Sequence, residues 1–122
     1  MERKERGRTG ERAAERMLRR EGLVILARNW RAGGGELDLV ALEGDTIVFL
    51  EVKSRAEGFS IPWPDVAPGQ RRRIGRAARA FRERYGIERR PFRFDTVRIT
   101  GDAEAPGAIA WERAAVAGAE GR

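Results

Sequence analysis

The sequence predicts a single α/β domain in which a helix, three strands, a second helix and a fourth strand follow one another. Three observations lead to this prediction. The length of 122 residues is that of one ordinary domain. Two arginine-rich segments carry apolar residues at helical spacing, and several short apolar segments are bounded by glycine or proline. With 41% apolar residues, the chain can bury a small core.

Two helices are expected, over residues 9–20 and 70–85. The apolar positions of the first helix recur at helical spacing and are Ala13, Ala14, Met17 and Leu18. Thr9 suits an N-cap and Gly22 a helix stop, so residues 1–8 are expected to form a charged tail. The apolar stripe of the second helix consists of Ile74, Ala77, Ala78 and Phe81.

The strands are expected in segments that are apolar and free of proline. They cover residues 23–29, 36–42, 46–52 and 92–99, with a further short strand within 108–115. Residues 58–69 contain three prolines and are expected to form a loop, in which Trp63 either stacks on a nucleic-acid base or lies buried. The last residues, 117–122, are expected to be a tail.

Two residue types are missing, because the chain has no cysteine and no histidine. This excludes disulfides, thiolate or imidazole zinc sites, cysteine nucleophiles and histidine general bases. Any metal must be held by carboxylates, carbonyls and water, which suit Mg²⁺, Mn²⁺ or Ca²⁺. The sequence has no apolar run that could span a membrane and no apolar secretory signal, so we expect a cytoplasmic protein without a membrane partner.

The charge of the chain favours a polyanionic partner. The net charge is +6 and the sequence pI is about 11.0, as expected for a protein that binds nucleic acid or an anionic surface. A generally arginine-rich composition is the alternative explanation. Lysine is used differently: of 25 basic residues, only Lys4 and Lys53 are lysines. An ammonium group is compact and can lose its proton, whereas a guanidinium cannot, so Lys53 indicates a specific use.

The segment GELDLVALEGDTIVFLEVKSR, residues 35–55, predicts a hairpin of two central strands, because both of its faces are apolar. A two-residue turn at Gly44–Asp45 would set the register. In that register Asp38 lies opposite Glu51. One pair further out, Glu36 lies opposite Lys53. One face then carries Val40, Leu42, Ile47 and Phe49, and the other carries Leu37, Leu39, Ala41, Val48, Leu50 and Val52.

Two carboxylates that face each other at the edge of an apolar surface repel and are poorly solvated. Either one of them is protonated or a cation lies between them. Lys53 projects from the same face as Glu51, about 6.5–7 Å further along the strand. A salt bridge from Lys53 to Glu36 or Glu51 is the alternative. The acid pair, its apolar surroundings and the single strand lysine together favour a metal site.

Asp38, a gap of twelve residues, and then Glu51, Val52 and Lys53 resemble the PD-(D/E)XK nuclease motif, with Leu37 in place of its proline. The stretch GRTGERAAERMLRREGLVILARNWR, followed by the hairpin segment, resembles the bacterial YraN family, small proteins similar to archaeal Holliday junction resolvases. The resemblance covers roughly residues 6–99. It implies a restriction-endonuclease-like α/β fold, with a central mixed sheet flanked by helices. It also implies a metal-dependent endonuclease that acts on DNA, including branched or repair intermediates.

The resemblance implies a role for each site residue. Asp38, Glu51 and the backbone carbonyl of Val52 would hold Mg²⁺ or Mn²⁺, and the metal would activate the attacking water. Lys53 would orient that water or stabilise the developing negative charge. Glu11 matches an extra acidic ligand of resolvases, although the helix dipole alone also favours an acid in a first turn. A homodimer is expected because resolvase-like relatives are dimers, and no small-molecule cofactor is expected.

The second helix is strongly basic, since residues 71–90 contain nine arginines and two glutamates. So few acids cannot neutralise it, and we expect phosphate contacts rather than a merely solvated surface. The residues expected to bind nucleic acid are Arg55, Gln70, Arg71, Arg72, Arg73, Arg76 and Arg79. Gln70 stands where the family commonly carries lysine. Trp30, beside Arg28 and Arg31, either stacks on a base or is a buried or semi-exposed side chain.

Two further functions stay open at this point. One is a non-catalytic nucleic-acid-binding module of nuclease fold that serves DNA processing. It predicts salt-dependent binding without turnover. The other is a structural or partner-binding protein whose positive charge reflects composition alone, and it predicts no DNA binding at physiological salt.

Overall fold

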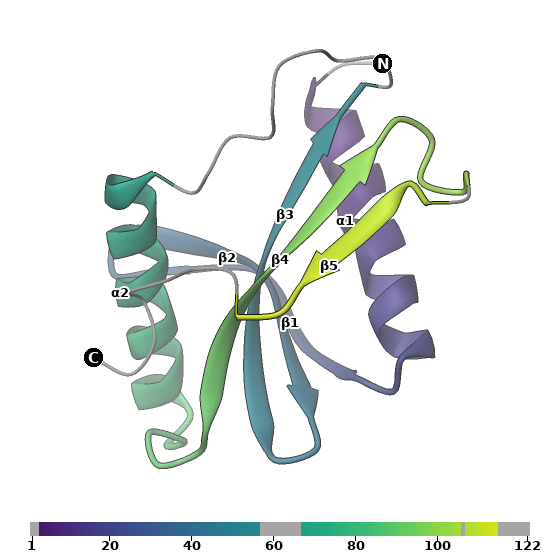
Figure 1. Cartoon of the computed structure of the whole chain (residues 1–122). Helices are drawn as coiled ribbons and strands as arrows, with labels where there is room; N and C mark the ends of the chain where they lie inside the picture. Colours follow the sequence, from purple (N-terminus) through teal and green to yellow (C-terminus); the bar gives the residue numbers. More distant parts are fainter. Residues whose placement is uncertain (1–2, 57–66, 106, 115–122) are drawn as a thin grey trace.

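The computed structural model describes residues 3–56, 67–105 and 107–114, which form two helices and one five-stranded sheet (Figure 1). The elements are α1 (Arg3–Arg20), β1 (Val24–Ala32), β2 (Gly35–Glu43), β3 (Thr46–Arg55), α2 (Pro68–Arg84), β4 (Phe92–Thr100) and β5 (Ile109–Glu112). The predicted α/β class and the order of elements are confirmed, and β5 is the short additional strand. Trp63 and the expected tail at 117–122 lie outside the described residues.

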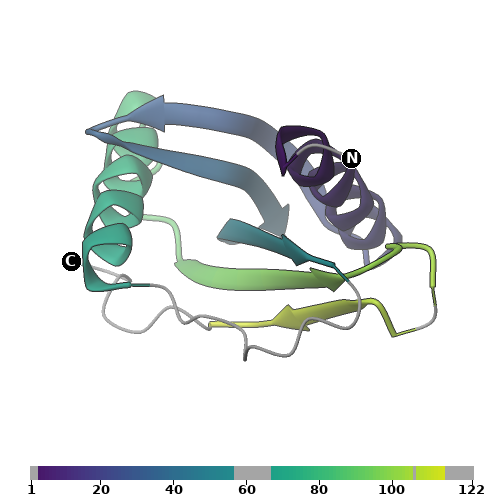
Figure 2. The same ribbon diagram turned by 90° about the horizontal axis from the view of Figure 1, so that it is seen from above.

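The sheet is mixed and its strands follow one another in sequence order, from β1 to β5. The pairs β1–β2, β2–β3 and β4–β5 are antiparallel, and β3 and β4 are parallel. Helix α1 covers one face and α2 the other, as the view from above shows (Figure 2). The prediction that β2 and β3 are central strands is confirmed, because each has a neighbour on both sides.

Each face of the sheet carries its own hydrophobic core. Under α1, the core consists of Ala13, Ala14, Leu18, Leu23, Leu39, Ala41, Val48, Leu50, Val97 and Ile99. Under α2, it consists of Leu37, Val40, Ile47, Phe49, Ile74, Ala77, Ala78, Phe81 and Phe94. Trp30 packs edge-on against Phe81, with ring centroids 5.2 Å apart, so it belongs to the α2 side of the core. Trp30 is half-buried, which agrees with the prediction of a buried or semi-exposed side chain.

The predicted hairpin register is confirmed only in its inner part, from Glu43–Thr46 to Leu39–Leu50. The predictions that Asp38 pairs with Glu51 and Glu36 with Lys53 in the strand ladder are wrong. Beyond Leu39 and Leu50, β2 pairs only with β1, and β3 only with β4. Leu37 and Val40 share one core cluster although they are three positions apart, so the alternation of faces breaks between them. Leu37 was predicted on the opposite face.

Both helices begin earlier than predicted. Helix α1 begins at Arg3, so Thr9 lies inside it and is not its N-cap, and residues 3–8 form its first turns. Arginine and glutamate are strong helix formers, which explains why the charged run continues the helix. Helix α2 begins at Pro68, which suits a first helical position because proline lacks the N–H that would be unbonded there. Neither helix, as far as it is described, is long and apolar enough to cross a membrane.

The turn between β1 and β2 docks on the backbone of α2. Gly33 and Gly34 both have positive φ, at 63° and 79°, a conformation that glycine adopts without strain. A Cβ atom on Gly35 would lie 2.2 Å from the carbonyl oxygen of Arg73, so no larger residue fits. Arg76 Nε donates a hydrogen bond to the Gly33 carbonyl at 3.0 Å. This contact holds α2 against the turn that joins β1 and β2.

Candidate functional site

The site lies where the sheet forks, between the outer parts of β2 and β3. In Figure 1, β2 passes behind α2 while β3 continues beside β4. Asp38 is the first β2 residue beyond the last β2–β3 pair, and its Oδ2 accepts a hydrogen bond from the backbone N–H of Val52 at 2.8 Å. The Asp38 carboxylate thus replaces a strand partner for Val52. This bond holds Asp38 across the fork.

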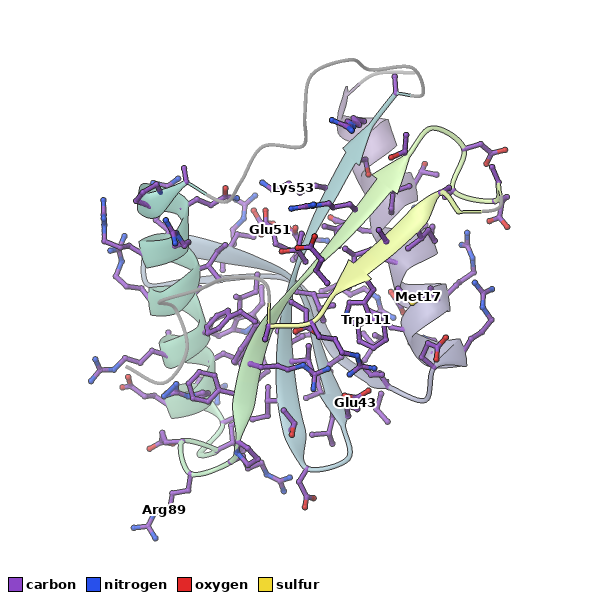
Figure 3. The ribbon with its side chains drawn as sticks, in the orientation of Figure 1. Met17, Glu43, Glu51, Lys53, Arg89 and Trp111 are labelled. Carbon is purple, nitrogen blue, oxygen red and sulfur yellow. The ribbon has the colours of Figure 1, made fainter. Side chains whose placement is uncertain are left out.

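Three side chains from two elements meet on the β3 side of the fork. Glu51 and Lys53 project from β3, as labelled in Figure 3, and their Oε1 and Nζ atoms are 3.4 Å apart. Gln70, in the first turn of α2, donates from Nε2 to the same Glu51 oxygen at 2.9 Å. Lys53 Nζ donates to Gln70 Oε1 at 3.3 Å. The Glu51 and Lys53 side chains are only 13% and 25% exposed, so water screens this cluster weakly.

The carboxyl groups of Asp38 and Glu51 lie close enough for each to change the pKa of the other. Burial, followed by the charge of Asp38, raises the pKa of Glu51 to about 7, although the Lys53 ammonium opposes this shift. Burial also raises the pKa of Asp38, to which the charge of Glu36 contributes, while the Val52 N–H opposes the shift. Between about pH 4.5 and 7 the pair therefore tends to retain a proton that two exposed carboxyl groups would lose.

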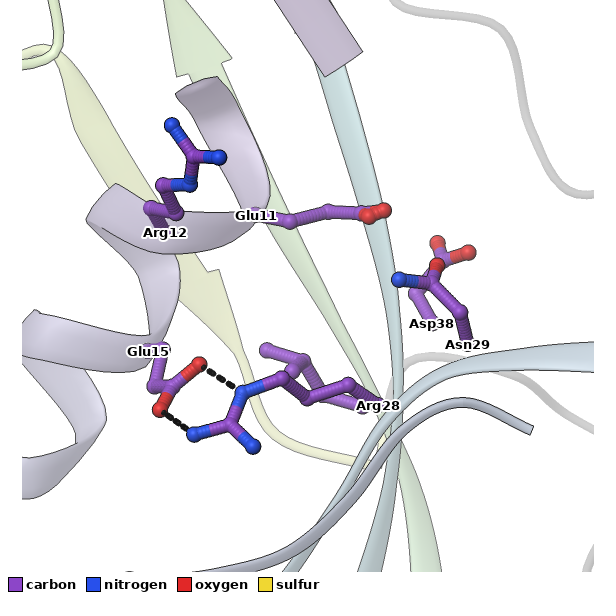
Figure 4. Close-up of a pocket in the computed structure, with 7 residues that line it drawn as sticks. Glu11, Arg12, Glu15, Arg28, Asn29 and Asp38 are labelled. Atoms are coloured by element: carbon purple, nitrogen blue, oxygen red, sulfur yellow. Dashed lines mark hydrogen bonds and ion pairs between the residues drawn. The ribbon is translucent and has the colours of Figure 1, made fainter. Parts of the chain in front are cut away.

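A polar cavity of about 330 Å³ opens on the α1 side of Asp38. Its walls are Glu11, Arg12, Glu15, Arg28, Asn29, Asp38 and Leu39. Figure 4 shows Glu11 reaching from α1 toward Asn29 and Asp38. With its amide nitrogen facing Glu11, Asn29 donates to both carboxylate oxygens, at 3.0 and 3.2 Å. Glu11 and Asp38 therefore share one cavity, as the predicted metal role of Glu11 requires.

Arg28 and Glu15 form the far wall of this cavity. Arg28 Nε donates to Glu15 Oε2 at 2.7 Å, and a second guanidinium nitrogen bonds the other carboxylate oxygen. The hydrogen bond from Arg28 is the main reason that the pKa of Glu15 falls to about 2. The next residue, Asn29, has φ of 48°, a backbone conformation that asparagine tolerates better than most residues. The ion pair between Arg28 and Glu15 thus holds the β1 backbone next to Asn29.

The donor set at the fork fits a small divalent cation. Mg²⁺ commonly takes one or two carboxylates and keeps several waters, and Asp38 and Glu51 can supply such a pair. The described residues include no group of three or more Asp, Glu, His or Cys arranged to hold a metal ion. Val52 joins the site through its N–H. The roles of the Val52 carbonyl and of Glu11 as metal ligands stay predictions.

The predicted nucleic-acid-binding residues separate into two groups. Arg72, Arg73, Arg76 and Arg79 are exposed along α2, and Arg55 and Arg71 are half-buried. Gln70, also half-buried, lies in the acid–lysine cluster instead of on the exposed surface. Arg73 also lines a second cavity, of about 470 Å³, together with Arg31, Glu36 and the glycine turn.

Residue spacing did not indicate Asn29 as a site residue, nor the contact of Gln70 with Glu51 and Lys53, and the predicted nucleic-acid contact of Gln70 stays a prediction. A compositional signal was available for both, because they are the single asparagine and the single glutamine in the chain. Lys53 was noticed because lysine is rare in this chain, and the rarity of asparagine and glutamine is the same kind of signal. Their contacts depend on a strained β1 residue and on the docking of α2, neither of which follows from residue spacing.

Comparison with known proteins places most of the chain in one family. A family model described as "Uncharacterised protein family UPF0102" matches residues 10–99. A UPF0102 protein of Oleidesulfovibrio alaskensis is 48% identical over 101 residues, which are 82% of this chain and 50% of that protein. One of Nitratidesulfovibrio vulgaris is 46% identical over 95 residues, 77% of this chain and 71% of that protein. One of Pseudomonas aeruginosa is 40% identical over 113 residues, 88% and 89% of the two chains.

Proposed function

The chain belongs to the uncharacterised protein family UPF0102, and we propose that it is a metal-dependent endonuclease that hydrolyses phosphodiester bonds of DNA, including branched or repair intermediates. The acid pair at the fork is the observation that carries this proposal. Burial raises the pKa of both Asp38 and Glu51, and the Lys53 ammonium lies 3.4 Å from Glu51. A cation between the two carboxylates would offset their burial and their mutual repulsion, which together otherwise keep a proton there.

Asp38 and Glu51 would hold Mg²⁺ or Mn²⁺, with the Val52 carbonyl and Glu11 as further oxygen donors. The bound metal supplies an activated water and stabilises negative charge on the scissile phosphate. Lys53 would donate to an oxygen of that phosphate, because its ammonium is the cationic group beside Glu51. The Val52 N–H keeps Asp38 ionisable at the fork by bonding its carboxylate.

Helix α2 would place the substrate. Its exposed arginines, Arg72, Arg73, Arg76 and Arg79, follow directly after Gln70, which touches the acid–lysine cluster. Phosphates bound along this helix would therefore lead the strand toward the fork. Such contacts position nucleic acid without reading its sequence, which suits recognition by shape.

The test compares the wild type, Asp38→Asn and Lys53→Ala on linear, flapped and four-way DNA, with EDTA, Mg²⁺ or Mn²⁺. We expect metal-dependent cutting that Asp38→Asn abolishes and that Lys53→Ala lowers about a hundredfold or more, as for loss of a group that stabilises transition-state charge. DNA affinity should be retained in both variants. The matched control is Asp45→Asn, which removes an exposed acid from the β2–β3 turn.

Cutting that persists at full level in Asp38→Asn would contradict the proposal. If all variants bind DNA with salt-dependent affinity and none cuts, the chain is a non-catalytic nucleic-acid-binding module instead. That alternative is supported by the lack of a three-acid group among the residues that the structure describes. A parallel series with RNA of the same shapes would show which nucleic acid is the substrate.

A further inference from the structure

We propose that Gln70 is a positioning residue that holds Lys53 beside Glu51 and ties both to helix α2. Its catalytic consequence rests on the proposed nuclease function. The contacts of Gln70 with Glu51 and Lys53, which we call the clamp, are a property of the free protein. They can be tested without substrate or metal.

The geometry is a closed triangle of polar contacts. Gln70 Nε2 donates to Glu51 Oε1 at 2.9 Å, and Gln70 Oε1 accepts from Lys53 Nζ at 3.3 Å. The third side is the ion pair between Lys53 Nζ and Glu51 Oε1 at 3.4 Å. One amide thus serves the acid with its nitrogen and the lysine with its oxygen. Lys53 is held from two directions, by a carboxylate on its own strand and by a carbonyl on α2.

The amide supplies a donor and an acceptor at once, which a charged side chain of similar length does not. Glutamate would accept from Lys53 but, when ionised, could not donate to Glu51. Lysine or arginine could donate to Glu51 but could not accept from Lys53. In a chain with 25 basic residues and a single glutamine, this position carries the glutamine, and arginines occupy the three positions that follow it. A residue that served only to contact phosphate would need no acceptor group.

The position of Gln70 is set by helix α2, which is held against the sheet. Pro68 begins this helix two residues before Gln70. The backbone at Arg73, one turn further on, contacts Gly35 so closely that a Cβ atom there would lie 2.2 Å from the Arg73 oxygen. Gln70 therefore sits on a fixed first turn. The helix that carries the exposed arginines is then also the element that sets the position of the Lys53 ammonium.

The direct test measures how readily Lys53 reacts with an amine-acylating reagent, site by site, by mass spectrometry. The chain contains one other lysine, Lys4, which serves as an internal reference. In Gln70→Ala we expect Lys53 to be acylated about two- to tenfold faster than in the wild type, the effect of losing one hydrogen bond to a charged group. The rate at Lys4 should not change. Equal Lys53 rates in the two proteins would overturn the clamp.

Two further variants separate the two halves of the clamp. Gln70→Glu keeps an acceptor for Lys53, so the protection of Lys53 should survive. Gln70→Leu, similar in size to glutamine and without polar atoms, should lose protection as Gln70→Ala does. If Gln70→Glu reacts as fast as Gln70→Leu, the Gln70 oxygen does not hold Lys53 and the inference fails. The matched control is Arg72→Ala, which removes an exposed side chain from the same turn of α2 and should leave the Lys53 rate unchanged.

DNA cleavage then tests the consequence. We expect Gln70→Ala to lower kcat while KM and DNA affinity stay within about twofold, because the clamp acts on Lys53 and Glu51 and not on phosphate. The opposite result, a raised KM with unchanged kcat, would make Gln70 the nucleic-acid contact that the sequence predicted. If the wild type does not cut DNA, the nuclease proposal fails, and the acylation rates still decide whether Gln70 holds Lys53.

Discussion

The carboxyl group of Glu51 titrates near neutral pH. Its pKa is about 7 in the folded protein and near 4.5 when it is free of the fold. Between these two values the folded state keeps a proton that the unfolded state has released. Stability with respect to this group is therefore greatest below about pH 4.5 and falls as the pH rises through 7.

We expect the metal-free protein to need less urea for unfolding at pH 8 than at pH 5.5. Glu51→Gln should flatten this dependence, because its neutral amide does not titrate. Glu15, whose pKa is lowered to about 2, changes stability only at pH values well below this window. The measurement is a series of urea titrations with EDTA present. A midpoint that rises from pH 5.5 to pH 8 in the wild type would contradict the expectation.

Residue spacing could predict that Asp38 and Glu51 come together, because the short turn fixes the hairpin register as far as Leu39 and Leu50, and the two acids are the next residues outward. Residue spacing could not predict the contacts that Asn29 and Gln70 make in the site. Asn29 reaches Glu11 from a strand residue with positive φ, and Gln70 reaches Glu51 only because α2 docks over the fork. Both contacts depend on tertiary packing between elements distant in sequence.

At the scale of elements, helix α2 lies directly against the sheet at Gly35, where the Arg73 backbone leaves no room for a side chain. Gly35→Ala would push a methyl group against the Arg73 backbone, at 2.2 Å from its oxygen and 2.7 Å from its carbon. Backbone atoms cannot turn aside as a side chain can. We expect a loss of about 3 kcal/mol in the free energy of unfolding, at the upper end of common single substitutions.

Gly69→Ala is the matched control for this prediction. A Cβ atom at Gly69 meets only the guanidinium ends of Arg72 and Arg73, at 3.9 and 3.5 Å. Alanine should instead favour the helix by up to about 1 kcal/mol. Chemical denaturation of both variants measures the difference, and equal stabilities would show that α2 does not rest on Gly35.

The strands followed from apolar segments without proline, and the inner hairpin register followed from the short turn at Gly44–Asp45, both of which are local signals. The end of the β2–β3 ladder did not, because β2 stays with β1 while β3 stays with β4 beyond Leu39 and Leu50. That choice between neighbours is made by the whole sheet. The early start of α1 was missed because a charged run was assigned to a tail although its residues favour a helix.

For the whole molecule, the net charge of +6 and the arginines on α2 predict binding dominated by phosphate contacts. Arg72, Arg73 and Arg79 are all exposed on this helix. Replacing the three with alanine should lower the slope of log affinity against log salt by about 2–3 for duplex DNA, since each phosphate contact contributes about 0.9. Fluorescence anisotropy over a range of salt concentrations measures it.

A control of equal charge change replaces Arg20, Arg89 and Arg90, which are exposed and lie outside the proposed binding surface. Figure 3 shows Arg89 near the end of α2 that is opposite to Lys53. The control variant should keep most of the wild-type slope of log affinity against log salt. If both triple variants lose the same slope, the positive charge acts only as a diffuse field, and α2 is not a defined binding surface.

The hairpin that carries Asp38 and Glu51 also has a consequence for the order in which the protein folds. Its strands are joined by two residues, and a hairpin closes in about 1–10 μs, well before helices distant in sequence can dock. The two acids therefore meet before Gln70 arrives from α2 or Glu11 from α1. Their repulsion opposes an early step, so the rate of folding, and not only the final stability, should depend on whether that pair holds a proton.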